Sequence, residues 1–199
     1  MPEAHEQLEH AEHAEHAAGA NKKIALLIAI IALFLAFSET LGKSANTEAL
    51  TLNIKASDTW SFFQAKTIRR TVVQAAADEM KIEALSAADN PAKAAMSKQI
   101  EEWQKTAARY RSEPETQEGS EELMKRAQAA EHERDTALAR YHNYEIASAA
   151  FQIGIVLCSA AVITGMLVLA WLAGGIAILG IVFTAIGFLA PNLLHLAGH

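Results

Sequence analysis

Apolar residues form long runs near both ends of the chain and a periodic pattern between them. The first run covers residues 24–41 and is long enough for about 27 Å of helix at 1.5 Å per residue. Near the C-terminus, residues 146–172 and 176–194 form two further runs, separated by Ala173–Gly175. Each run suffices to cross a bilayer. The pattern predicts three transmembrane helices, with the last two joined in a tight antiparallel hairpin at Ala173–Gly175.

The first run also has the length of the hydrophobic region of a signal peptide, and Ala36-Phe37-Ser38 resembles a small-x-small cleavage site. The preceding tail is long and acidic, with five glutamates before Lys22. A tail of this kind favours an uncleaved signal-anchor.

The middle of the chain shows helical periodicity. From residue 45 to 88 there is no proline or glycine, and apolar residues recur at steps of three and four, which predicts one long helix, continuous with the first span. Pro91 starts a second helix. The segment 112–119 ends it, and a heptad pattern then runs from residue 120 directly into the second span. The spans and the soluble part are therefore expected to share helices.

We thus expect an all-α membrane protein, with a long helical hairpin or coiled-coil-like soluble domain between the first and second transmembrane helices. We expect six parts along the chain: residues 1–23 (acidic histidine-rich tail), 24–41 (first span), 42–145 (soluble domain), 146–172 (second span), 176–194 (third span) and 195–199 (short C-terminal tail).

Small residues recur along the last two spans at the spacing that lets transmembrane helices approach closely. Gly154 belongs to this stripe in one span, and Gly180 and Gly187 belong to it in the other. We interpret these glycines as helix-packing positions.

Charge is segregated along the sequence. All 17 Lys and Arg lie between Lys22 and Arg140, and the last 54 residues contain no charged side chain apart from histidine in its protonated form. The formal net charge of −6 provides no basic surface, so nucleic acid is not expected as a partner. The single cysteine, Cys158, lies in an apolar run, where neither a disulfide framework nor a thiolate nucleophile is expected.

The N-terminal tail repeats glutamate and histidine every three residues. On a helix, His10, His13 and His16 would be close neighbours, and such pairs can bind Zn²⁺, Ni²⁺ or Cu²⁺. The alternative is a solvated acidic tail whose imidazoles gain charge as the pH falls towards 6. The spacing permits chelation without requiring it.

The stretch from Ser38 to Ala45, followed by Asn53 to Arg69, resembles the bacterial membrane proteins grouped as domain of unknown function 4337. Phe151-Gln152-Ile153-Gly154-Ile155 is similar to that family as well. The most specific part is the block Ala56-Ser57-Asp58-x-Trp60 with Gln64-Ala65-Lys66. The resemblance implies a three-span membrane protein and supplies no activity.

Within this block we single out five residues as candidates for packing or subunit contact: Asp58, Trp60, Phe63, Gln64 and Lys66. Asp58, Trp60 and Gln64 are spread around the helix and do not converge on one face, as a catalytic centre would require. No phosphate-binding glycine loop, nucleophile elbow or zinc-protease motif is present. An enzyme is not expected.

The sequence favours a non-enzymatic, homo-oligomeric scaffold in the inner cell membrane that presents its helical domain to a protein partner. Alanine-rich helix faces bury little area, so self-association would supply the missing burial. The alternatives are a divalent-metal-binding membrane protein that uses the histidine tail, and an oligomeric channel. Lys22 and Lys23 favour a cytoplasmic N-terminus with the soluble domain on the opposite side, although lysines and arginines on the domain side oppose this orientation.

Overall fold

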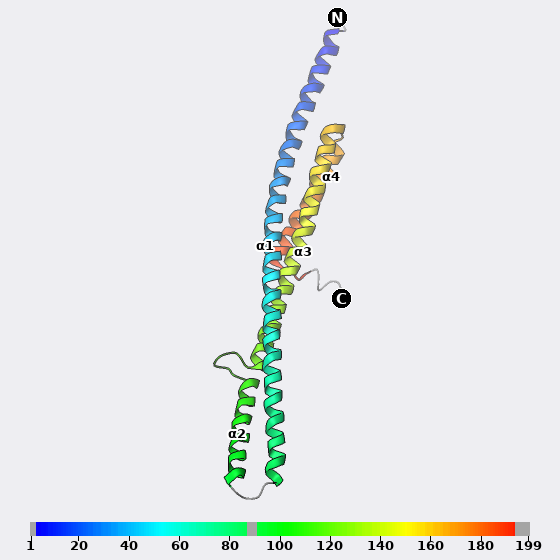
Figure 1. The fold of residues 1–199 in the computed structure, drawn as a ribbon. Coiled ribbons are helices and arrows are strands. Elements are labelled where there is room, and N and C mark those ends of the chain that lie inside the picture. The colour runs from blue at the N-terminus through cyan, green and yellow to red at the C-terminus, as the bar shows by residue number, and fades with distance from the viewer. Residues whose placement is uncertain (1–2, 87–90, 194–199) are drawn as a thin grey trace. The chain divides into compact units, whose positions relative to one another are not determined.

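The computed structural model describes the backbone of residues 3–86 and 91–193 and the side chains of residues 22–86 and 91–193. Within these ranges the chain is all-helical, with four helices and no strand: α1 (Glu3–Ser86), α2 (Pro91–Arg111), α3 (Ser120–Thr164) and α4 (Leu167–Leu189) (Figure 1). Pro91 opens α2, where its missing N–H is no loss. The expected break at 112–119 is confirmed, since α2 ends at Arg111 and α3 begins at Ser120.

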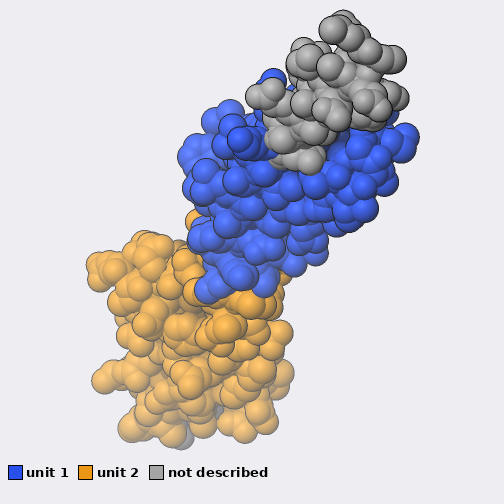
Figure 2. Space-filling model, turned by 90° about the horizontal axis from the view of Figure 1, so that it is seen from above, with its two compact units in different colours: residues 1–49, 135–199 blue, residues 50–134 orange. Residues whose placement is uncertain are grey.

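The chain divides into two compact units (Figure 2). Unit 1 contains residues 1–49 and 135–199, and unit 2 contains residues 50–134. Helices α1 and α3 each supply residues to both units. The expectation that the apolar runs and the middle segment share helices is therefore confirmed.

Helix α1 contains no proline, and its inward positions follow an unbroken alternation of three- and four-residue steps from Ile24 to Ala84. Every one of these positions is buried or half-buried: in unit 1, residues 24, 28, 31, 35, 38, 42, 45 and 49; in unit 2, residues 52, 56, 59, 63, 66, 70, 73, 77, 80 and 84. Most of the side chains are apolar or small. Lys66 and Arg70 are the two charged residues in the series.

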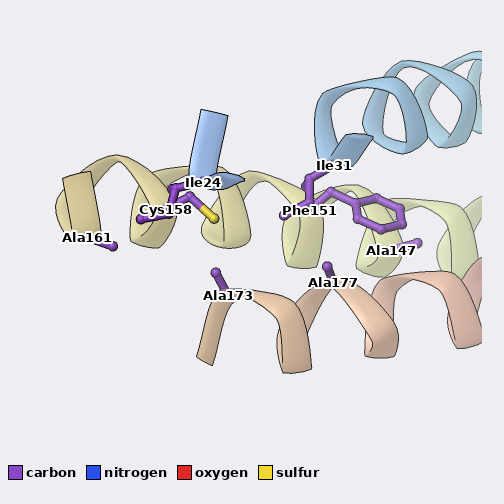
Figure 3. Packing of buried hydrophobic residues seen from close by; sticks show 8 residues of the cluster. All are labelled: Ile24, Ile31, Ala147, Phe151, Cys158, Ala161, Ala173 and Ala177. Carbon is purple, nitrogen blue, oxygen red and sulfur yellow. The ribbon is translucent and has the colours of Figure 1, made fainter. Parts of the chain in front are cut away.

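The core of unit 1 forms where α1, α3 and α4 meet. Ile24 and Ile31 of α1 join Phe151 of α3 and several small residues in one buried cluster (Figure 3). The small residues are Ala147, Cys158, Ala161, Ala173 and Ala177. Small side chains let the helices approach, and the larger side chains fill the space that remains.

Two polar side chains of unit 1 donate hydrogen bonds to backbone carbonyls. The buried Ser38 hydroxyl donates to the carbonyl of Tyr144 at 3.0 Å, and Asn143 Nδ2 donates to the carbonyl of Pro191 at 3.1 Å. These bonds connect α1 to α3, and α3 to the segment after α4. The other polar atom of the Asn143 amide, Oδ1, is buried and has no hydrogen-bond partner among the described residues.

The turn between α3 and α4 corrects the sequence interpretation. It lies at Gly165 and Met166, whereas Ala173–Gly175, the expected turn, lies inside α4. Gly165 has φ +70°, a conformation that glycine adopts without strain, and its N–H donates to the carbonyl of Ala161. The boundaries expected for the last two spans, 146–172 and 176–194, are therefore wrong at this turn. The sequence stays hydrophobic through the turn, so no polar segment indicates where the turn lies.

Three helices of the described chain are long and apolar enough to cross a membrane: residues 22–86 of α1, and helices α3 and α4. Trp171 and Phe188 on α4 are 78% and 71% exposed. Large apolar side chains in this state are characteristic of a surface that faces lipid.

Candidate functional site

The residues that sequence reasoning singled out between positions 58 and 66 lie on the part of α1 that belongs to unit 2. Asp58 and Gln64 are exposed, Trp60 and Phe63 are half-buried, and Lys66 is buried with 7% of its surface accessible. The block thus places aromatic and cationic groups against α2 and α3 and leaves a carboxylate and an amide at the surface.

Trp60 connects α1 to α3. Its indole Nε1 donates to Glu131 Oε1 at 2.9 Å, and its ring meets Phe63 edge to face with a centroid distance of 5.3 Å. A half-buried indole needs a partner for its N–H, which Glu131 provides. Trp60 also lines a hollow of about 320 Å³, in which polar groups such as Ser57, Gln64 and Arg134 are prominent.

Lys66 lies in a cage of carboxylates and aromatic rings. Its Nζ is 3.8 Å from Glu113 Oε2 and 3.5 Å from Glu118 Oε2. The same nitrogen lies 5.4 Å from the ring centroid of Phe62 and 5.5 Å from that of Tyr110, within the range of a cation–π interaction. Removing a charge from water costs several kcal/mol unless it is paired, and these four groups offset that cost.

The acidic partners of Lys66 belong to the connection between α2 and α3, which is itself tightly bonded. Glu122 Oε1 accepts from the Ser112 hydroxyl at 2.7 Å, and Glu122 Oε2 accepts from the backbone N–H of Glu113 at 3.2 Å. The hydroxyl bond of Ser112 is the main reason that the pKa of Glu122 is lowered from 4.5. A Cβ at Gly119 would collide with the Glu122 carboxylate and with the backbone of Ser112 and Glu113, so this close approach requires glycine.

The connection therefore closes over the side chain of Lys66 and holds its two carboxylates in place. The ammonium is surrounded by carboxylates and aromatic rings of its own chain, and only 7% of the residue is accessible.

The glycines singled out in unit 1 lie at close helix contacts. A Cβ on Gly180 would lie 2.7 Å from Cε1 of Phe151, and one on Gly187 would lie 2.8 Å from Cε1 of Tyr144. Gly154 is buried near Ile31 and near the carbonyl of Ala173. All three glycines face neighbouring helices.

The candidate metal ligands His10, His13 and His16 lie outside the residues whose side chains the structure describes. Among the side chains that it does describe, no group of three or more His, Cys, Asp or Glu is placed to hold a metal ion.

Sequence reasoning did not identify Glu113, Glu118 and Glu131 as the partners of the block, nor Arg70 as a charged inward position. Two signals were available. The three- and four-residue alternation places Lys66 and Arg70 on the inward face of α1. The acidic composition of the segment 112–119 provides counter-charges, although their pairing with Lys66 depends on tertiary structure.

Comparison with known families gives one match. The family model described as Domain of unknown function (DUF4337) matches residues 20–190. No curated protein and no solved structure matches the chain.

Proposed function

Since the chain belongs to the domain of unknown function 4337 family, whose description names no activity, we propose a role from its geometry: a non-enzymatic membrane scaffold that assembles with further copies of itself. In this proposal unit 1 is embedded in the bilayer by three spans, and the helices of unit 2 form a coiled-coil-like soluble domain that pairs with the same domain of another copy.

Membrane insertion is supported by the three apolar helices and by the composition of the chain after residue 145. Ordinary soluble proteins do not leave long apolar helices with this degree of exposure. A bilayer would cover them.

The observation that carries the assembly proposal is a second apolar seam on α1, opposite its inward face. Every seventh residue from 54 to 82 is isoleucine, serine, isoleucine, alanine and isoleucine. All five are exposed, and Ile54, Ile68 and Ile82 expose 62%, 63% and 69% of their surface. Ile68 is two residues from both Lys66 and Arg70, which is about 200° around a helix, so the seam faces away from the unit's own core.

A second copy is the partner that this seam favours. The core of unit 2 buries mainly alanines, among them Ala56, Ala77, Ala107, Ala127 and Ala130, which contribute little hydrophobic area. Each copy carries the same heptad-spaced seam, so two copies can pair through one self-complementary surface. Pairing would bury the isoleucines and add the hydrophobic area that the core lacks.

The test is disulfide crosslinking of the full chain in membranes. In a Cys158→Ala background, Ile68→Cys is placed at the centre of the seam, and Arg69→Cys, the next residue along the helix, serves as the matched control. Ile68 lies near its counterpart in either a parallel or an antiparallel pairing centred on the seam. Mild oxidation is therefore expected to give a covalent dimer with Ile68→Cys and much less with Arg69→Cys.

A second measurement makes the result decisive. Light scattering in mild detergent is expected to show an oligomer for the native chain and a monomer for an Ile54→Asp, Ile68→Asp, Ile82→Asp variant. A native monomer that gives no crosslink at position 68 would refute the proposal.

A further inference from the structure

Arg70 is the second charged residue on the inward face of α1, four positions after Lys66, and the described part of the chain places no ion-pair partner at it. Its Nε is buried and has no hydrogen-bond partner among the described residues. None of the ion pairs found in the described part of the chain includes its guanidinium. A buried N–H donor without an acceptor costs about 1–3 kcal/mol, more when the group is charged.

Arg70 lines a groove between α1 and α2 with a volume of about 290 Å³. Ala77, Ala107 and Ala108 provide small side chains along this groove, and the remaining lining residues are polar or charged. The polar side chains are Gln74, Asp78 and Lys81 from α1 and Gln104 and Arg111 from α2. The groove therefore contains hydrogen-bond donors from both helices.

The charges at the groove do not cancel. Arg70, Lys81 and Arg111 contribute three positive charges, and Asp78 of the lining and Glu121, the partner of Arg111, contribute two negative ones, which leaves a net charge of +1. Lys81 pairs with Asp78 at 2.7 Å, and Arg111 uses its Nε for Glu121 at 2.7 Å. The terminal nitrogens of Arg111 and the guanidinium of Arg70 remain as donors for an external anion.

We propose that this groove binds a small phosphate monoester. A phosphate monoester carries about −1.5 to −2 charge at pH 7, opposite in sign to the net positive charge at the groove. Arginine forks bind phosphate oxygens through paired N–H donors, and the two glutamine amides add neutral donors. The volume of about 290 Å³ lies just below the range of drug-sized ligand sites, roughly 300–1,000 Å³, and so suits a phosphate group with a short substituent.

The site is independent of the proposed self-association, because none of its lining residues belongs to the seam of Ile54, Ile68 and Ile82. The monomeric seam variant is therefore expected to retain phosphate binding.

The experiment is isothermal titration of the full chain in an uncharged detergent at low salt, with glycerol 3-phosphate as the probe. We expect saturable binding of one molecule per chain in the millimolar range or tighter. Arg70→Gln is expected to weaken it at least tenfold, which corresponds to about 1.4 kcal/mol. Arg69→Gln, an equal loss of charge at the exposed neighbouring residue, should change the affinity by less than twofold.

A second variant keeps the test valid where Arg70→Gln affects folding. Gln104 is exposed and lines the groove, so Gln104→Glu adds a negative charge there without disturbing a buried position, and it should abolish binding. Gln128→Glu, an exposed position on α3 outside the groove, is its matched control.

The same titration distinguishes the source of the phosphate. Dihexanoyl phosphatidic acid below its micellar concentration carries the same phosphate monoester on a lipid. Affinity equal to that of glycerol 3-phosphate would assign a soluble ligand, and tenfold tighter binding would assign a lipid headgroup. Absence of saturable binding by both probes, equal losses in Arg69→Gln and Arg70→Gln, or equally tight binding of succinate would each overturn the proposal.

Discussion

At the scale of single residues, the burial of Lys66 raises the question of whether its ion pairs stabilise unit 2 or only specify its arrangement. The carboxylates of Glu113 and Glu118 keep 19% and 50% of their side-chain surface exposed, so each can return to water if the ammonium is removed. A flexible apolar side chain of similar length would meanwhile fill the inward position. In comparable buried pairs, apolar replacement is often neutral or stabilising.

We therefore expect Lys66→Met to leave the thermal midpoint within a few degrees of the native value. Lys66→Ala is expected to lower it by about 5 °C or more, because truncation of a buried side chain leaves a cavity worth roughly 2 kcal/mol or more. Both variants should accelerate cleavage by a glutamate-specific protease within residues 112–119, because Glu118 loses its ion pair with Lys66 and Glu113 keeps only the one with Arg109. Lys55→Met, at an exposed position of the same helix, should change neither property. Equal destabilisation by Met and Ala would mean that the ion pairs themselves stabilise the fold.

At the scale of helices, unit 1 depends on close approach between α3 and α4. Gly180→Ala would place a Cβ 2.7 Å from Cε1 and 2.9 Å from Cζ of the Phe151 ring, and Phe151 is 1% exposed and has little room to move. We expect this substitution to destabilise the protein by about 1–3 kcal/mol, as overpacking does in other cores. Gly174→Ala in the same helix meets no atom within 4 Å and should be neutral or slightly stabilising.

Thermal unfolding followed by circular dichroism in detergent would compare the two alanine variants. The control also tests the position of the turn, because a turn at Ala173–Gly175 would make Gly174→Ala harmful. A stable Gly180→Ala together with a destabilised Gly174→Ala would contradict the helix pairing described above.

The helices themselves were largely predictable, because the three- and four-residue periodicity, Pro91 and the polar segment 112–119 are local signals. The turn at Gly165 was not, since Gly174 and Gly175 form the stronger glycine signal and the sequence around Gly165 is as apolar as the helices beside it. The side-chain partners could not be predicted from the sequence either. Trp60 pairs with Glu131 across 71 residues of sequence, and no local pattern encodes such a distance.

At the scale of the whole molecule, α1 and α3 each contribute residues to both units. A change in the pairing of unit 2 would therefore act directly on helices that also build unit 1. In the assembly proposed above, the output would be the arrangement of the copies.

This arrangement predicts a definite membrane topology. With three crossings, the turn at Gly165 and Met166 should lie on the side of residues 1–23, and unit 2 should lie on the opposite side, outside the cell if the N-terminus is cytoplasmic. In a Cys158→Ala background, a membrane-impermeant maleimide should label Thr116→Cys in intact cells and should label Met166→Cys only after permeabilisation. Both native residues are exposed, so access to the reagent is decided by the membrane. Labelling of both positions from the same side would rule out three crossings. Labelling of Met166→Cys in intact cells, and of Thr116→Cys only after permeabilisation, would agree with three crossings and place the N-terminus outside.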